Sequence, residues 1–124
     1  METNTRTPGH DLGRAAETLA AASLRSQRLV ILSRNWRCRE GELDIVATDG
    51  YRLIVVEVKA RSSGEFGSPA EAITAAKQAR IRAATQAWLR RYQLGWCPVR
   101  FDVVSVLWPP SGEPRLEHFA GAFS

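Results

Sequence analysis

The chain is poor in cysteine and has no long hydrophobic run. Its two cysteines, Cys38 and Cys97, lack CxxC spacing and are too few for a disulfide framework, which favours a reducing, intracellular setting. No apolar run reaches the roughly 18–20 residues that span a bilayer. The polar residues 1–9 contain no apolar segment of the kind found in signal peptides. We therefore expect a cytoplasmic protein that does not enter a membrane.

Lysine is also scarce, and one long stretch has no acidic residue. The 17 basic residues are fifteen arginines and two lysines, with a net charge of +4. Residues 72–101 contain six basic residues and no acidic one. A stretch of one charge sign suits the phosphate backbone of a nucleic acid, with DNA expected more than RNA, although a solvated helix face would show the same pattern. The candidate nucleic-acid contacts are Arg61, Lys77, Arg80 and Arg91.

The 124 residues, 44% of them apolar, suit one globular domain. We expect a disordered tail over residues 1–9 and a single domain over residues 10–124. Hydrophobic periodicity and turn residues predict helices over residues 11–27 and 69–91. They predict strands over residues 29–38, 42–48, 51–60, 99–107 and, as a short edge strand, 115–119. This order describes a mixed α/β sheet with helices packed on it.

The dipeptide Asp49-Gly50 predicts a tight hairpin between the second and third strands. A two-residue loop would place Asp44 opposite Val55 and diagonal to Glu57. Because strand side chains alternate between faces, one face then carries Glu42, Asp44, Glu57 and Lys59, together with Val46, Leu53 and Val55. The other face is plain core, with Leu43, Ile45, Ala47, Ile54, Val56 and Val58.

The neighbouring carboxylates of Asp44 and Glu57 need compensation, because like charges this close on a sheet are unfavourable. Lys59 supplies one positive charge, and a bound cation would supply more. Hard oxygen ligands without histidine or cysteine indicate Mg²⁺ or Mn²⁺. The alternative is ordinary surface charge on an exposed hairpin, but the apolar residues on the same face indicate partial burial.

The segment GELDIVATDGYRLIVVEVKARS resembles the core motif of the YraN-like family, a small bacterial group with a restriction-endonuclease-like fold and a PD-(D/E)xK motif. The core is also similar to archaeal Holliday-junction resolvases, which share the αβββαβ arrangement. The resemblance covers nearly all of the chain from Asp11 onward. Further matching positions are Gly13, Glu17, Ala20, Arg34, Asn35, Lys77, the run from Arg100 to Val103, and the segment from Phe119 to Phe123. One departure is Arg28, which stands where the family commonly has a turn glycine.

The resemblance implies a role for each matching site residue. Asp44 and Glu57 would be metal ligands, and the carbonyl of Val58 would add a third. Lys59 would orient or activate the attacking water. Glu17 would complete the carboxylate cluster or bind a second metal ion. Glu42 has two possible roles: it could assist the metal, or it could fix a neighbouring arginine such as Arg37 or Arg39.

Three hypotheses about function follow. The first is a divalent-metal-dependent endonuclease that hydrolyses phosphodiester bonds in DNA, with branched or structured DNA as one candidate substrate. One site per chain would then require a homodimer to cut both strands. The second is a nucleic-acid-binding protein that keeps the fold with little or no cleavage, and the third is a scaffold for another protein. Intact Glu17, Asp44, Glu57 and Lys59 favour the enzyme.

Several other residues allow two interpretations. Lys77 lies on the apolar stripe of its helix, and its amine either reaches the carboxylates or a phosphate, or extends to water. Asp102 is predicted to pair with Arg100 or another arginine. His10 and His118 are isolated and lack metal spacing. The tryptophans could offer base-stacking surfaces, although packing explains most of them; they are Trp36, Trp88, Trp96 and Trp108.

Overall fold

The computed structural model describes residues 8–63 and 73–124, with side chains from residue 12 onward. Its helices are α1 (Pro8–Ser26) and α3 (Ala75–Arg91). Its strands are β1 (Val30–Cys38), β2 (Gly41–Thr48), β3 (Leu53–Arg61), β4 (Val99–Leu107) and β5 (Arg115–Phe123). They form one five-stranded sheet in the order β1-β2-β3-β4-β5, in which β3 and β4 are parallel and the other neighbours antiparallel. The mixed α/β fold with an αβββαβ core is confirmed.

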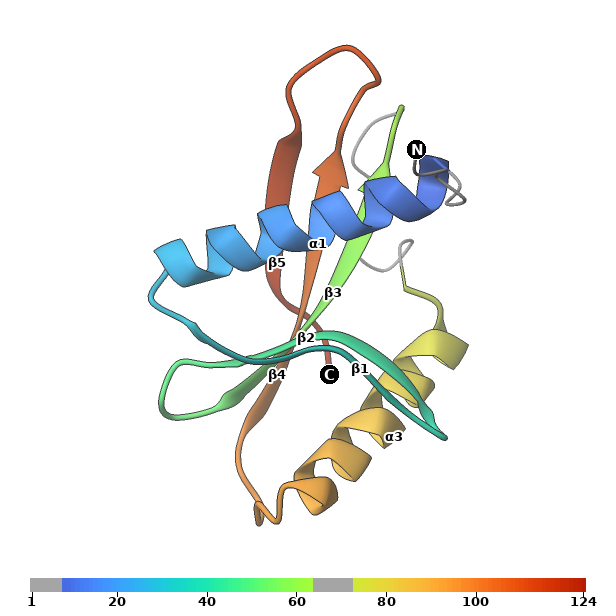
Figure 1. Ribbon diagram of the computed structural model, residues 1–124. Helices are drawn as coiled ribbons and strands as arrows, with labels where there is room; N and C mark the ends of the chain where they lie inside the picture. The colour runs from blue at the N-terminus through green and yellow to red at the C-terminus, as the bar shows by residue number, and fades with distance from the viewer. Residues whose placement is uncertain (1–7, 64–72) are drawn as a thin grey trace, which may run out of the picture.

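The sheet is strongly twisted, and a helix covers each face. In Figure 1, β1 and β2 run across the view while β3, β4 and β5 run from top to bottom. Helix α1 packs over a cluster that includes Ile45, Ile54 and Val104. Helix α3 packs over the opposite face, against a cluster that includes Val55 and Val103. Neither helix of the described part is long and apolar enough to cross a membrane.

Most predicted elements lie within two residues of their observed positions, and the exceptions lie at the ends. Helix α1 begins at Pro8, so residues 8 and 9 are helical, while residues 1–7 of the predicted tail lie outside the described part. Helix α3 begins at Ala75, later than residue 69, because the Thr74 hydroxyl caps it by accepting from the Lys77 N–H at 3.1 Å. Residues 69–72 lie outside the described part. Strand β5 extends past residue 119 to Phe123, whose ring stacks on Phe101.

The turn between β2 and β3 is longer than the two residues predicted, and this corrects the strand register. The Asp49 carboxylate accepts from the backbone N–H groups of Tyr51 and Arg52, both at 2.9 Å, which holds these residues in the turn. Thr48 therefore pairs with Leu53 and not with Tyr51. The shift of two residues keeps each side chain on its face. Asp44 and Glu57, predicted as a diagonal pair, are the residues that adjoin the last pair of the ladder, Ile45 and Val56.

Strand β2 parts from β3 beyond Ile45, and the strict alternation of its side chains fails there. The pairing of β2 with β3 ends at Ile45 and Val56. Leu43, predicted to share a face with Ile45, packs instead in the cluster under α3. Leu43 changes face just after the point where the hydrogen-bonded pairing of β2 with β3 ends. Asp44 therefore lies where the two strands separate.

A buried aspartate ties the edge strand β5 to the sheet. Asp102 is fully buried and accepts from Arg100 Nε and Nη2, both at 2.8 Å, and from the Gly121 N–H at 3.0 Å. His118 Nε2 donates to the same carboxylate at 2.8 Å, and Gln27 Nε2 lies 3.2 Å from His118 Nδ1. The predicted pairing with Arg100 is confirmed. His118, isolated in the sequence, is part of this cluster.

We expect Asp102→Asn to lower the free energy of unfolding by about 3 kcal/mol, because it leaves Arg100 without its charge partner. Burial alone would raise the pKa of Asp102, but the hydrogen bonds from His118 and Arg100 outweigh burial and hold the pKa at about 2. The stabilisation is thus present above the unfolded pKa near 4 and is lost as the pH falls toward 2. Urea unfolding at neutral pH and at pH near 2 measures both effects. Glu117→Gln, on exposed β5 surface, is the control, and equal stability of the two variants would contradict the account.

Candidate metal centre

A small cavity opens where β2 parts from β3, beneath the first turns of α3. Its volume is about 200 Å³. Strand β2 contributes Asp44, strand β3 contributes Glu57, and helix α3 contributes Lys77 and Arg80. Gly41 also lines the cavity, and a Cβ there would be in ordinary van der Waals contact with Arg80, 3.6 Å from its carbonyl oxygen. Glu42 also lines the cavity, so the fold assembles three carboxylates and two cations around one opening.

Asp44 is positioned by the backbone of the neighbouring strand. Its Oδ2 accepts from the Val58 N–H at 2.8 Å, across the point where the strands separate. This bond satisfies one oxygen of the half-buried carboxylate. It orients Asp44 beside Glu57, the residue that precedes Val58.

Glu57 is the most unusual residue of the site, because its carboxylate is 2% exposed. Its Oε1 lies 3.8 Å from Lys77 Nζ, which is a long ion pair. Its Oε2 is buried and has no hydrogen-bond partner among the described residues. A buried carboxylate oxygen without a partner is costly, so it calls for an explanation such as an ion.

The two carboxylates disturb each other's ionisation. Burial raises the pKa of Glu57, and the charge of Asp44 raises it further, while Lys77 opposes both. Burial also raises the pKa of Asp44 against the lowering effect of the Val58 N–H, and Glu17 adds to the increase. The protein alone therefore resists holding both groups ionised. A bound cation would favour the ionised form of both.

The donor set fits a hard divalent cation. Mg²⁺ is commonly held by one or two carboxylates, with water and substrate phosphate completing its shell, and Asp44 and Glu57 supply two carboxylates. The unpartnered Glu57 Oε2 supplies a free donor atom. No group of three histidine, cysteine or acidic side chains in the described part of the chain is close enough to hold an ion. The described arrangement is thus a two-carboxylate site.

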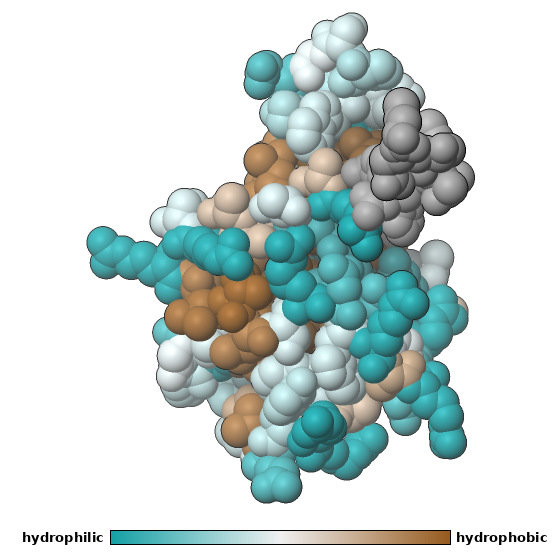
Figure 2. All heavy atoms as spheres, in the orientation of Figure 1, coloured by the Kyte–Doolittle hydropathy of each residue, from teal (hydrophilic) through white to brown (hydrophobic). Residues whose placement is uncertain are grey.

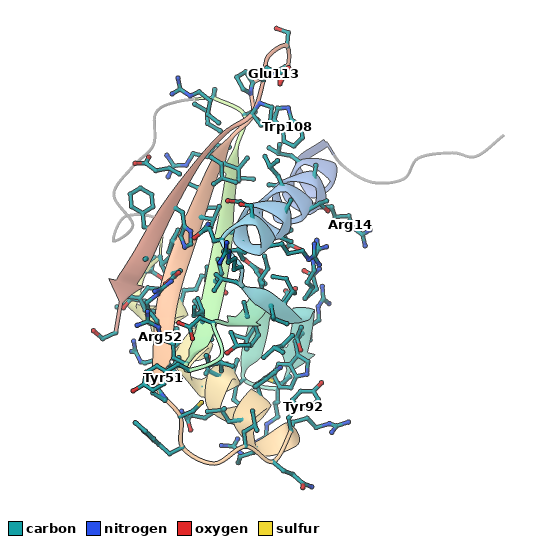
Figure 3. The ribbon with its side chains drawn as sticks, turned by 90° about the vertical axis from the view of Figure 1, so that its left-hand side faces the viewer. Arg14, Tyr51, Arg52, Tyr92, Trp108 and Glu113 are labelled. Atoms are coloured by element: carbon teal, nitrogen blue, oxygen red, sulfur yellow. The ribbon has the colours of Figure 1, made fainter. Side chains whose placement is uncertain are left out.

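Glu17 lies beside this pair without joining it. It lines an adjoining cavity of about 470 Å³ between α1 and the β1–β2 hairpin, and Asp44 also lines that cavity. Its charge reaches Asp44, whose pKa it raises. Arg14 borders the same cavity and extends outward from α1 (Figure 3). Glu17 therefore faces Asp44 from the first helix, as a residue that assists the site would.

Glu42 lies at the mouth of both cavities. It is exposed, and its Oε2 is 3.7 Å from Arg37 Nε. Of the two arginines that the sequence suggested as partners, the structure pairs it with Arg37. Its charge also raises the pKa of Asp44 and of Glu57.

The two lysines differ in their relation to the carboxylates. Lys59 is exposed and forms no ion pair with a carboxylate of the described residues. Lys77, from α3, contacts Glu57 although its side chain is 46% exposed. The sequence assigned the lysine of the motif to the site and left Lys77 open. The one clue to Lys77 was its place on an apolar helix stripe.

The candidate nucleic-acid contacts do not form one cluster. Lys77 and Arg80 line the cavity of the carboxylates. Arg91 lies at the other end of α3, 14 residues and therefore roughly 21 Å along the axis from Lys77, and its guanidinium is 5.2 Å from the Tyr92 ring. Arg61 ends β3, where its carbonyl accepts from the Trp108 N–H at 2.8 Å. Of the four, Lys77 and Arg80 share a cavity with Asp44 and Glu57.

We expect Lys77→Ala to leave Mn²⁺ affinity unchanged or tighter, because a cation that competes for Glu57 is removed. Binding of DNA in the presence of metal should weaken by a few-fold, since one phosphate contact is lost. Isothermal titration with Mn²⁺ and anisotropy with labelled DNA measure the two effects, and Arg25→Ala, at an exposed position of α1, serves as control. A large loss of Mn²⁺ affinity in Lys77→Ala would contradict this arrangement.

The fold and the site together define a structural class. A mixed sheet with an αβββαβ core, and an Asp and a Glu-x-Lys on separating strands, is a restriction-endonuclease-like arrangement.

The model of the "Uncharacterised protein family UPF0102" matches residues 16–106. A UPF0102 protein of Frankia alni is 51% identical over 112 residues, covering 90% of this chain and 93% of its own length. A UPF0102 protein of Arthrobacter sp. (strain FB24) is 50% identical over 110 residues, covering 89% of this chain and 93% of its own length. The chain belongs to the UPF0102 family, as its YraN-like motif predicted.

Proposed function

We propose that this protein is a divalent-metal-dependent endonuclease that hydrolyses phosphodiester bonds in DNA, with Mg²⁺ or Mn²⁺ held by Asp44 and Glu57. The observation that carries the proposal is the buried Glu57 Oε2, which lacks a partner and lies beside a second carboxylate. A divalent cation at these residues would polarise the phosphate and favour ionisation of a water molecule. The carbonyl of Val58 is a further proposed donor.

The other residues of the site would bind the substrate and stabilise charge. Lys77 and Arg80 would hold the phosphate from α3, by charge and not by reading bases. Lys59 would orient the water and offset charge that develops on the phosphate, and Glu17 would hold a proton or assist a second ion. Hydrolysis adds water across one P–O bond, and the leaving oxygen takes up a proton. Two copies of the chain would cut both strands of a duplex, and a cytoplasmic location would suit this substrate.

The direct test incubates purified protein with labelled single strands, duplexes, splayed arms and four-way junctions, with Mg²⁺, Mn²⁺ or chelator. We expect metal-dependent cleavage of at least one DNA structure. The exposed position of Lys59 favours one rival, a DNA-binding protein without catalysis. Metal binding and DNA binding without cleavage of any structure would support that rival over the proposed function.

A further inference from the structure

A larger cavity lies at the far end of α3, away from the carboxylates. Its volume is about 730 Å³, and it is lined by the last turns of α3, the loop after the helix and the start of β4. Its walls include Arg82, Leu89, Arg90, Leu94 and Trp96. None of these residues takes part in the proposed metal site.

Trp96 is the most exposed large hydrophobic residue of this surface, with 89% of its area open to solvent. Trp88 in contrast is 4% exposed, and its Nε1 donates to Ser33 Oγ at 3.0 Å. Leu94 is also exposed and lines the same cavity. The loop is anchored behind Trp96, because the Pro98 carbonyl accepts from the Leu53 N–H at 2.8 Å. Folding thus leaves an indole ring at the surface beside a cavity.

Arginine side chains line the cavity beside this ring. Arg82 and Arg90 line the cavity, and residues 72–101 contain no acidic residue. Arg82 Nη1 donates to the Ser124 main-chain oxygen at 3.0 Å. An exposed aromatic face beside guanidinium groups matches a single-stranded nucleic acid, whose bases stack on the ring while its phosphates meet the arginines. A duplex hides the faces of its bases and would use only the charges.

The surface is separate from the carboxylate site. Arg80 lines the carboxylate cavity and Arg90 the larger one, and both belong to α3. Ten residues of helix separate them, which is roughly 15 Å along the axis. Because the helix has about 3.6 residues per turn, the residues that line the two cavities lie on opposite flanks of α3. A ligand at Trp96 therefore occupies a surface of its own.

We infer that the surface formed by Trp96, Leu94, Arg82 and Arg90 binds an unpaired segment of DNA by base stacking. The inference rests on the proposed function and narrows its substrate class to DNA that contains a single-stranded part. A fully paired duplex would lack the stacking contact.

The test measures binding with chelator present, so that cleavage plays no role. Anisotropy of labelled oligothymidylate and of a blunt duplex is recorded for wild type, Trp96→Ala, Trp96→Phe and Trp96→Leu. We expect Trp96→Ala and Trp96→Leu to weaken single-strand binding by roughly 5- to 100-fold, the range for losing one stacked base. Trp96→Phe should retain most of the affinity, and duplex affinity should stay unchanged in all variants.

Three results would overturn the inference. The first is equal affinity of wild type and Trp96→Ala for the single strand. The second is equal affinity of Trp96→Leu and Trp96→Phe for the single strand. The third is a loss of duplex affinity in Trp96→Ala as large as its loss of single-strand affinity. The second result would indicate apolar contact without stacking. Metal-dependent cleavage is assayed separately on the same preparations, so cleavage that persists in these cases leaves the proposed function intact. Absence of both binding and cleavage in wild type would remove the two together.

Discussion

Glu57→Gln is expected to lower Mn²⁺ affinity by more than ~100-fold, beyond the loss seen when a group supporting a metal ligand is removed, and to stabilise the metal-free protein. The first effect follows because the substitution removes a charged ligand atom. The second follows because the Glu57 carboxylate is buried, has one oxygen without a partner and repels Asp44. The amide carries no charge and could donate to Asp44. A gain of about 0.5–2 kcal/mol in the free energy of unfolding is the usual size for relieving such a conflict.

Mn²⁺ titration and urea unfolding in chelator measure these opposite effects on one variant. Glu117→Gln, exposed on β5, is the matched control and should change neither. A site that merely carries a structural ion pair between Glu57 and Lys77 would behave differently. In that case Glu57→Gln would destabilise the protein, and Mn²⁺ affinity would not depend on residue 57.

Lys59→Ala is expected to reduce single-turnover cleavage by about 100-fold or more, the scale observed when one preorganised electrostatic group is lost. The fold and Mn²⁺ affinity should be retained, because Lys59 is exposed and is no ligand of the proposed metal. Its effect thus differs from that of Glu57→Gln, which removes metal and cleavage together. Lys59→Arg keeps the charge and should recover part of the rate. Equal cleavage by wild type and Lys59→Ala would assign the role of this lysine to another residue, with Lys77 as the first candidate.

The helices, the strands and the α/β class were predictable because the chain marks them locally. Strand β4 is a β-branched run with turn residues on both sides, and its predicted bounds match Val99–Leu107. The register of β2 and β3 was not predictable from Asp49-Gly50, since side-chain bonds from Asp49 lengthen the turn. The position of Leu43 was not predictable either, because alternation along β2 fails where its pairing with β3 ends. These errors arise from contacts that no periodic pattern records.

The candidate site was predictable in its central pair and not in its surroundings. Asp44 and Glu57 could be placed on one face because a shift of two residues preserves alternation. The contact of Lys77 with Glu57 joins residues 20 positions apart, and it depends on how α3 packs. The exposure of Trp96 depends in the same way on the loop that follows α3. The sequence identifies the residue types, and packing decides which of them meet.

Single-turnover cleavage of the best DNA substrate by wild type and Glu57→Gln, prepared in parallel, tests the central claim most directly. The account predicts cleavage by wild type that requires Mg²⁺ or Mn²⁺, stops with chelator and is lost in Glu57→Gln. Metal-dependent cleavage of equal rate by both proteins would show that the activity belongs to another site or to a contaminant, and it would contradict the account.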